Sequence, residues 1–489
     1  MNNDLLDHKA FSACRNVYLA QAPAAEYESC RVSAAPELHG PCAVSPAAAA
    51  LREMFQCAGL DPARFGQAEW NPLAAVIRPG DRVLIKPNWV LHESRSGHGL
   101  DSLVTHPSLI ETVLQYAMKT SPASVVIGDA PLQACDFSAL MRTCGIEERV
   151  ERSGAGGAVS VRDFRLVTRD GHDRWAQTGL TSRSLDEYVL FDLGRDSSLE
   201  PITRDDSEFR VTMYDPQGLR STHGVGRHQY LIARELIEAD VVLNLPKLKT
   251  HKKAGMTGAL KNMVGANGHK QYLPHHRKGG AAGGGDCYPG SSGWKSLAED
   301  MLDQGNRRSG VLARGLCSLG ASAALRAGSL FGGDNNVEGA WHGNDTLWRM
   351  TLDLQTILHY GRSDGRLDSA PQRRVLSITD AIIAGEGEGP LAPIPAPIGV
   401  LTMSANTAAA DWVGAALLGY DPSAICLTRE AFRTGNFPLT EFAPDDIVVR
   451  APGGEMSVAD MTRRFRRKVI APQGWKDLET PPAGKEQAA

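Results

Sequence analysis

The stretch Asp240–Tyr272 constrains this chain most, because it joins an expected buried strand to a strongly basic segment. The apolar run Val241–Leu243 predicts a strand, which Asn244 and Pro246 then close. Five basic residues follow within seven positions: Lys247, Lys249, His251, Lys252 and Lys253. A buried strand that leads into polar side chains and glycines is a common way for α/β proteins to build a ligand site.

Lys261 lies ten residues after His251, between Gly258 and Gly265. Burial beside other cations would lower the pKa of this lysine, and its neutral amine could then act as a nucleophile or a base. His251 could transfer protons near neutral pH. Two alternatives stay open, namely an ordinary solvated basic loop and an ion pair between Lys261 and a nearby acid.

Three further apolar runs, at 82–85, 124–127 and 374–378, also predict strands. A helix expected over 108–119 separates the first two and is preceded by His106, which gives a strand–helix–strand unit. The carboxyl ends of parallel strands are where such sheets bind ligands. Polar side chains follow all three runs at that end: Lys86, Asn88, Asp129 and Asp380.

The order of these elements predicts an α/β fold, a mostly parallel sheet with flanking helices, an antiparallel β-hairpin insertion and peripheral helices. An N-terminal extension is expected over 1–70 and an α/β core over 71–296. The remaining parts are a polar β insertion within that core (about 150–220), a helical insertion (297–365), completion of the core (366–450) and a C-terminal tail (451–489). Arg463–Lys468 and the terminal PPAGKEQAA are expected to be peripheral and disordered.

A second glycine-rich segment, 385–390, alternates glycines with carboxylates. We expect it to face the basic segment, with Glu386 as a general base or a metal ligand; a solvated turn is the alternative. The run 279–285 contains five glycines and is a candidate lid. Three histidines between Lys261 and this glycine run are candidate metal ligands: His269, His275 and His276.

The charge of the whole chain excludes some classes of partner. A net charge of −4 over 489 residues gives no general attraction to nucleic acid or to an anionic membrane, so neither partner is expected. The positive charge is local, which favours a small anionic ligand. No apolar run approaches eighteen residues and the N-terminus lacks a secretory signal.

The nine cysteines are scattered, and no two have C-x-x-C spacing. This pattern is typical of reduced thiols in a cytoplasmic protein, and we expect no iron–sulfur cluster.

Several segments resemble one known family, DUF362, whose biochemical role is largely undefined. The resemblance covers about residues 80–430 and rests on VLIKPNW, ADVVLNLPKLKTHKKAGMTGALKNMVG, DAIIAGEGEGP and AAADWVGAALLGYDP. Many members of that family add a ferredoxin-like iron–sulfur segment, whose cysteines are absent here.

The chain is more distantly similar to the N-terminal domain of the LarA-type lactate racemases. That domain has a histidine and a lysine at the same spacing as His251 and Lys261, and Thr105-His106-Pro107 resembles its upstream histidine segment. In that family the lysine tethers a nickel pincer cofactor and the histidines act as acid–base groups. The resemblance therefore implies a His/Lys site, while the cofactor of this chain is left unknown, with a divalent metal ion as a candidate.

We predict an enzyme that acts on a small carboxylated or phosphorylated metabolite by proton or group transfer, in the manner of a racemase, an isomerase or a transferase. Its expected catalytic residues are His251, Lys261, Asp380 and Glu386. Its expected substrate-binding residues are Lys86, Asn88, His106, Asp129, Lys247, Lys249, Gly258 and Asn262. A metal-dependent enzyme with Asp, Glu and His ligands and a non-enzymatic binding or accessory protein are the alternatives. The oligomeric state is left open.

Overall fold

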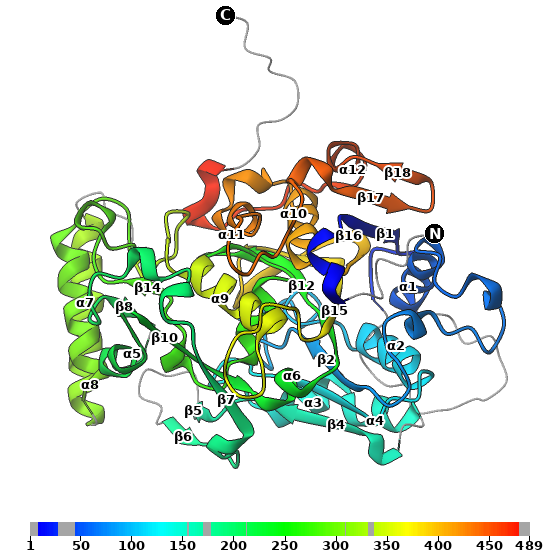
Figure 1. Ribbon diagram of the computed structural model, residues 1–489. Coiled ribbons are helices and arrows are strands. Elements are labelled where there is room, and N and C mark those ends of the chain that lie inside the picture. Colours follow the sequence, from blue (N-terminus) through cyan, green and yellow to red (C-terminus); the bar gives the residue numbers. More distant parts are fainter. Residues whose placement is uncertain are drawn as a thin grey trace, which may run out of the picture.

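A computed structural model describes residues 8–27, 45–153, 156–169, 178–211, 213–308, 310–330 and 337–478. Eleven strands among these residues form one large sheet (Figure 1). Nine strands follow the order β18-β17-β1-β16-β15-β11-β2-β3-β4, and β12 and β13 join it beside β15. The bounds of these strands are β1 (Asn16–Gln21), β2 (Arg82–Pro87), β3 (Ser124–Asp129), β4 (Val159–Asp163), β11 (Val241–Leu245), β12 (Lys247–His251), β13 (Gly255–Thr257), β15 (Arg374–Glu388), β16 (Ala392–Ser404), β17 (Val448–Ala451) and β18 (Gly454–Met456).

The centre of the sheet is parallel, from β15 through β11, β2 and β3 to β4. Val241 of β11 lies opposite Val83 of β2 on one side and Arg374 of β15 on the other. Toward the other edge, β16 pairs in antiparallel fashion with β15 and with β1, β17 follows β1 in parallel, and β18 is the antiparallel edge strand. The predicted α/β fold with a mostly parallel sheet is therefore confirmed.

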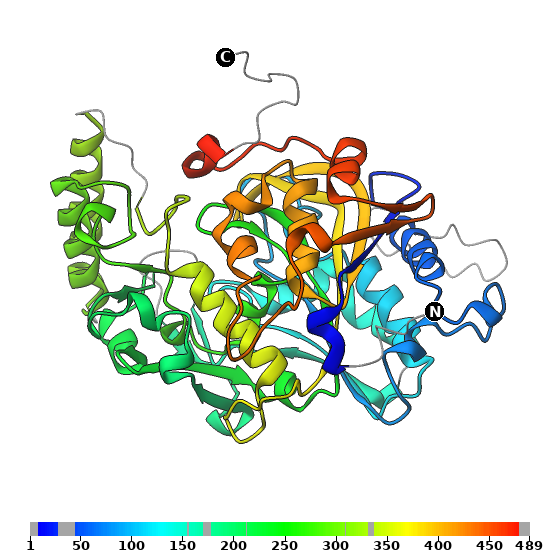
Figure 2. The same ribbon diagram turned by 45° about the horizontal axis from the view of Figure 1, so that its top comes forward.

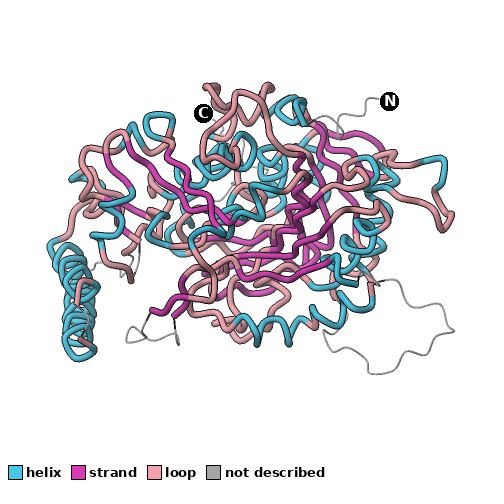
Figure 3. The backbone as a smooth tube through the Cα atoms, turned by 60° about the horizontal axis from the view of Figure 1, so that its bottom comes forward, coloured by secondary structure: helices cyan, strands magenta, loops and turns pink. Residues whose placement is uncertain are grey.

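Helices lie on both sides of the sheet because its central strands are apolar on both faces (Figure 3). Val83 and Ile85 pack into the core that contains α1 and α2, whereas Leu84 between them packs into the core that contains α9. The helices in the described part of the chain are α1 (Pro46–Cys57), α2 (Pro107–Met118), α3 (Phe137–Cys144), α4 (Ile146–Arg152), α5 (Pro216–Thr222), α6 (Arg234–Glu238), α7 (Gly293–Asn306), α8 (Val311–Leu330), α9 (Leu347–Tyr360), α10 (Thr407–Leu417), α11 (Cys426–Glu430) and α12 (Val458–Phe465).

The polar segment 150–220 is only partly the antiparallel insertion that was expected. Its first strand, β4, extends the large sheet in parallel with β3. Residues 167–169 and 178–180 pair with each other in antiparallel fashion, as expected, and the remaining strands form small antiparallel sheets with later parts of the chain. These contain β5 (Val167–Arg169), β6 (Thr178–Leu180), β7 (Tyr188–Asp192), β8 (Phe209–Arg210), β9 (His223–Gly224), β10 (Arg227–Ala233) and β14 (His276–Arg277).

The basic and acidic segments differ from expectation, because each of them is largely a strand. Lys247–His251 forms β12, which pairs with β15 in parallel and with β13 in antiparallel fashion. The acidic segment is the end of β15, which continues to Glu388 and pairs with β16. The two segments do face each other, because Lys249 of β12 pairs with Gly385 of β15, but they do so as neighbouring strands rather than as loops. Backbone pairing over long sequence separations overrides the local glycine and charge pattern.

Both ends of the described chain also belong to the fold. Within the expected N-terminal extension, β1 lies between β16 and β17 of the large sheet. Arg463–Lys468 was expected to be disordered and is not, because α12 contains its first residues and the Arg467 amide donates to Leu417 O (3.0 Å). Figure 2 shows these C-terminal elements in orange and red above the sheet. The terminal PPAGKEQAA lies outside the described residues.

The C-terminal segment returns to the basic strand region through Trp475. Its indole is buried, donates to Lys252 O (2.9 Å), and lies where a side chain at Gly255 would otherwise stand. The Gly387 amide donates to Ile470 O (2.7 Å) in the same region.

We expect Trp475→Ala to lower the free energy of unfolding by about 3–5 kcal/mol, because it empties a buried aromatic site. Urea denaturation of the full chain measures this loss. Trp294→Ala is the matched control: that side chain is 43% exposed, and its removal should cost less than about 1 kcal/mol. Equal costs for the two variants would contradict a packed C-terminal segment.

Candidate functional site

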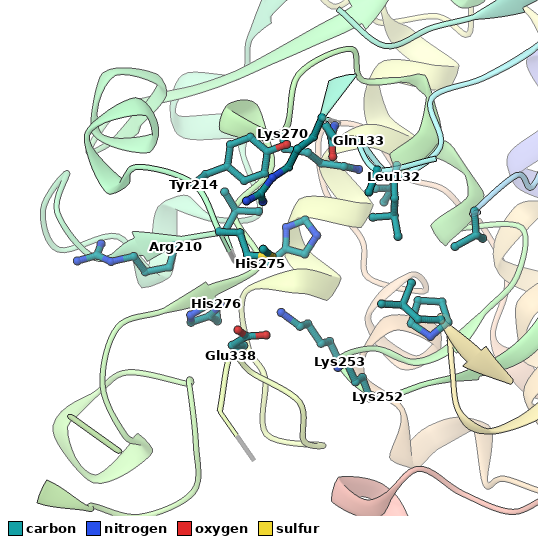
Figure 4. Close-up of a pocket in the computed structure, with 18 of the residues that line it drawn as sticks. Leu132, Gln133, Arg210, Tyr214, Lys252, Lys253, Lys270, His275, His276 and Glu338 are labelled. Carbon is teal, nitrogen blue, oxygen red and sulfur yellow. The ribbon is translucent and has the colours of Figure 1, made fainter. Parts of the chain in front are cut away.

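A cavity of about 520 Å³ lies at the carboxyl ends of β2, β3 and β12, within the range of small-molecule sites (Figure 4). Its other walls come from β8, β14 and the helices α7 and α8, so the helices expected to be peripheral line the site. Eight residues predicted from the sequence line this cavity: Asn88, Asp129, Lys249, His251, Lys261, Asn262, His275 and His276.

Other residues of the cavity were not assigned to the site from the sequence. The basic ones among them are Arg95, Arg169, Arg210, Lys252, Lys253, Lys270 and Arg314. Lys252, Lys253 and Lys270 lie in or beside the basic segment, so their proximity to Lys261 was the signal available. Glu299 and Arg314 come from α7 and α8, for which the sequence carries no such signal. Apolar side chains such as Leu132 and Tyr214 complete the lining.

A buried ion pair lies behind the cavity wall. Lys86 Nζ is 2.5 Å from Asp129 Oδ1, and neither side chain is more than 2% exposed. Lys86 Nζ also donates to Pro87 O (3.1 Å) and Asn262 O (3.1 Å), which occupies the three protons of its ammonium group. Asp129 Oδ2 accepts from the Trp89 amide (2.6 Å). Lys86 therefore connects the sheet to the segment that carries Lys261, rather than presenting its charge to a ligand.

Glycine at position 265 makes this pairing sterically feasible. A Cβ there would lie 1.8 Å from Asp129 Oδ1 and 2.8 Å from Lys86 Nζ. The short 3₁₀ helix Lys261–Ala266 can therefore lie directly against the pair.

The backbone around Lys261 is fixed by buried polar groups from three elements. Asp411 of α10 accepts from the amides of Ala259 and Leu260, while Gln355 of α9 donates to Leu260 O (2.7 Å). Asn262 Nδ2 donates to Asn244 Oδ1 of β11 (2.7 Å). Burial raises the pKa of Asp411 to about 7 against these hydrogen bonds.

The side chains of Lys261 and Lys270 line the cavity, and neither ammonium group makes a hydrogen bond or an ion pair with a described residue. Burial, followed by the charges of Lys270 and Lys253, lowers the pKa of Lys261 to about 7, against the opposing attraction of Asp129. Burial is also the main reason that the pKa of Lys270 falls to about 8. At neutral pH a substantial share of the Lys261 amine is therefore uncharged.

The hydrogen bonds of His251 fix its tautomer. Its Nδ1 accepts from the amides of Lys253 (3.1 Å) and Ala254 (3.1 Å), so Nδ1 carries no proton. Burial, and then the charge of Lys261, lowers the pKa of the ring well below its usual value. The neutral ring consequently carries its proton on Nε2 and acts as a donor.

His275 has the opposite tautomer. Its Nδ1 donates to Leu273 O (2.6 Å), which leaves the Nε2 lone pair as an acceptor. Lys249 is held more tightly than Lys261, since its Nζ donates to Asn88 Oδ1 (2.7 Å) and to Leu103 O. The cavity therefore contains side chains whose hydrogen-bonding roles are fixed, such as His275 and Lys249, together with the unpaired amine of Lys261.

Three predicted site residues gather in a separate buried cluster. Lys247 Nζ is 2.6 Å from Asp380 Oδ2, and both side chains are fully buried. Asp380 also accepts from the His106 amide (3.0 Å) and from the hydroxyl of Tyr27, whose ring stacks on the His106 ring. The His106 ring accepts from the Ser108 amide (3.3 Å) and thus caps α2. None of Lys247, Asp380 and His106 lines the cavity.

Four other predictions also fall outside the cavity lining. Glu386 accepts from the Ile470 amide (3.0 Å) in the C-terminal segment, and His269 caps a 3₁₀ turn by accepting from the Gln271 amide (3.1 Å). At Gly258, a Cβ would lie 2.1 Å from Asp411 Oδ1, so this glycine provides room for a buried carboxylate. The glycine run 279–285 lies outside as well, and its role as a lid stays a prediction.

The chain was also compared with known proteins. The model of a family described as "Domain of unknown function (DUF362)" matches residues 83–190 and 197–416, which is more than half of the chain. The chain belongs to the DUF362 family. A thylakoid-associated protein of Synechocystis sp. is 23% identical over 381 residues, which are 76% of each protein. Among the described residues, no helix combines the length and apolar character needed to cross a membrane.

The chain was also matched, weakly, to one solved structure. It is a protein of Thermotoga maritima from a structural genomics programme, with a TM-score of 0.33 and 9% identity. The match covers 73% of the DUF362 chain and 56% of the Thermotoga protein, so this chain spans little more than half of that protein's length.

The unpaired, half-buried Lys261 predicts an unusual pH dependence of stability. The unfolded chain keeps the Lys261 proton up to an ordinary pKa of 10.5, whereas the folded chain releases it near pH 7. Between these values the unfolded state binds more protons, so this residue makes the protein more stable as pH rises. Below pH 7 its burial penalty is fully present.

We therefore expect Lys261→Met to be more stable than the wild type at pH 6 and to lose this advantage as the pH approaches 10. Urea denaturation at pH 6 and pH 9.5 measures the change. Lys476→Met, at an exposed position, should show no such dependence. A Lys261→Met variant that is no more stable than the wild type at pH 6 would show that the lysine is not held at a cost.

Proposed function

We propose that this DUF362 protein is an enzyme that binds a small carboxylated or phosphorylated metabolite in the cavity and transfers a proton through Lys261. The observation that carries the proposal is the unpaired Lys261 amine, with its pKa near 7, on the wall of a cavity rich in cationic side chains. A general base is most effective when its pKa lies close to the working pH.

The charged side chains of the cavity support an anionic substrate. Lys270 has no partner among the described residues and is largely protonated at neutral pH, so it can bind a carboxylate or phosphate group. Arg169 and Arg210 add guanidinium groups to the same cavity, while two of its acids are already paired, Asp129 with Lys86 and Asp303 with Arg210. Apolar residues such as Leu132 and Val264 favour a ligand with a carbon skeleton beside its anionic group.

The proposed step is the removal of a proton from a carbon next to a carbonyl or carboxylate group. The carbon–hydrogen bond breaks, the neutral Lys261 amine takes the proton, and the electron pair moves to the substrate oxygen. His251 lines the same cavity and has its Nε2–H as the remaining donor, so it can stabilise that oxygen. Return of the proton to either face would give a racemase or an isomerase.

A metal-dependent enzyme is the second candidate function, because His276, Cys287 and Glu299 lie together on the cavity wall. We also propose a cytoplasmic location, which the free thiols of the described cysteines favour.

The proposal is tested by a thermal-shift screen of carboxylated and phosphorylated metabolites on the full chain, followed by NMR detection of solvent deuterium entering the ligand. We expect Lys270→Met to weaken binding of a hit by at least about tenfold, because a charged hydrogen bond is lost. Lys261→Met should abolish deuterium exchange. In His251→Asn the new side-chain oxygen can accept from the Lys253 and Ala254 amides in place of Nδ1, so the protein should stay folded. Loss of the Nε2–H donor should slow deuterium exchange.

Lys476→Met serves as the control, since it removes an exposed lysine and should change neither binding nor exchange. Ligand that binds but never exchanges deuterium would favour a binding or accessory protein. Exchange at the wild-type rate in Lys261→Met would remove this residue from the chemistry.

A further inference from the structure

Three potential metal ligands meet on the wall of the cavity formed by β14 and α7. They are His276 in β14, Cys287 in the loop that follows, and Glu299 in α7. Each offers one ligand atom, and these atoms all lie within 4.8 Å of one another. All three residues are more than nine-tenths buried and line the cavity.

The backbone around the three residues is held in place. The Cys287 amide donates to Gly279 O (3.0 Å), and its carbonyl accepts from the Gly339 amide (2.9 Å). Glu299 accepts from the Gly279 amide through both carboxylate oxygens (3.2 and 3.1 Å). The same carboxylate is hydrogen-bonded to the thiol of Cys287. The side chains are therefore positioned by contacts outside the cluster as well as within it.

One group in this cluster lacks the partner that burial normally requires. The Nδ1 atom of His276 is buried and makes no hydrogen bond with any described residue, although the side chain is only 5% exposed. A buried polar atom without a partner destabilises the fold, because it has lost its hydrogen bonds to water and gained none in return. Coordination of the imidazole fixes which ring nitrogen carries a proton and directs the other to a defined partner.

The chemistry of the donor set selects the ion. Thiolate, imidazole and carboxylate together suit zinc, and three protein ligands that leave a fourth position open are typical of catalytic rather than structural zinc sites. Bond lengths of about 2.0–2.3 Å place tetrahedral ligand atoms roughly 3.3–3.8 Å apart. The three atoms need to approach by at most about 1.0–1.5 Å from their limit of 4.8 Å.

We propose that His276, Cys287 and Glu299 bind one zinc ion, with its fourth position facing the cavity. Binding releases the thiol proton to solvent, and the thiolate and carboxylate together balance the two charges of the metal. The nearby cations include Lys253 and Arg210, which act on His276, and Lys278, which acts on Glu299. Figure 4 shows Glu338 beside Lys253 and His276. The negative charge of Glu338 offsets that of Lys253 next to the site. The site uses none of the residues assigned to proton transfer, so the two proposals fail independently.

Cobalt(II) is the spectroscopic probe for this site. The full chain is treated with a chelator, dialysed and titrated with Co²⁺, which gives an intense sulfur-to-cobalt absorption band only when a thiolate is bound. We expect one equivalent of Co²⁺ to produce the band, and Zn²⁺ to displace it. Cys287→Ser should abolish the band, whereas Cys57→Ser, the matched control in α1, should keep it.

Replacing either of the other two metal-ligating side chains should also weaken zinc binding. Because loss even of groups behind the ligands commonly costs 10–100-fold in affinity, we expect Glu299→Gln and His276→Gln to weaken Zn²⁺ binding by at least about tenfold. His342→Gln is the control, since His342 is exposed and outside the cluster. Competition with a chromophoric chelator measures these affinities.

A test on the wild-type protein does not depend on the folding of any variant. Bound Zn²⁺ should slow alkylation of Cys287, mapped by mass spectrometry, and leave that of Cys57 unchanged. Absence of a thiolate–cobalt band in the wild type, or equal alkylation of Cys287 with and without Zn²⁺, would overturn the proposal.

Discussion

The buried ion pair between Lys86 and Asp129 is the interaction on which the cavity depends. It joins the ends of β2 and β3 and, through Asn262 O, holds the 3₁₀ helix that carries Lys261 against the sheet. Breaking such a pair by removing one partner typically costs about 3–5 kcal/mol, because a charge is left buried and unpaired. The core of the fold therefore fixes the position of Lys261, although the side chain of this residue lines a cavity.

The same constraint divides the lysines in and around the cavity into two groups. Lys86 and Lys247 are fully buried and paired with carboxylates, so their charges are used within the fold. Lys261 and Lys270 line the cavity without such partners among the described residues, and burial lowers the pKa of each. A cluster of lysines in a sequence can thus contain residues that stabilise the fold and residues that are available to a ligand. Only the contacts of each ammonium group show to which kind a lysine belongs.

The α/β fold could be predicted from sequence because apolar runs such as Val241–Leu243 are short, bounded by turn residues and separated by a helix. The sequence also placed Asp129 near the basic segment that carries Lys261, because the strands before both end at the same edge of the sheet. Two things could not be predicted. The residues Lys247–His251 carry no strand-like apolar pattern, and their pairing with β15 is a tertiary effect. Glu299 reaches the cavity from a distant helix, which no local spacing indicates.

The central claim is that the fold holds Lys261 as a largely unpaired amine with a pKa near 7. NMR titration of the full chain with isotope-labelled lysine side chains tests it most directly, with the Lys261 signal assigned by its loss in Lys261→Met. The account predicts a midpoint near pH 7 for this signal, well below the ordinary lysine value of 10.5. A midpoint close to 10.5 would contradict it, because the amine would then be charged at every pH at which it is proposed to act as a base.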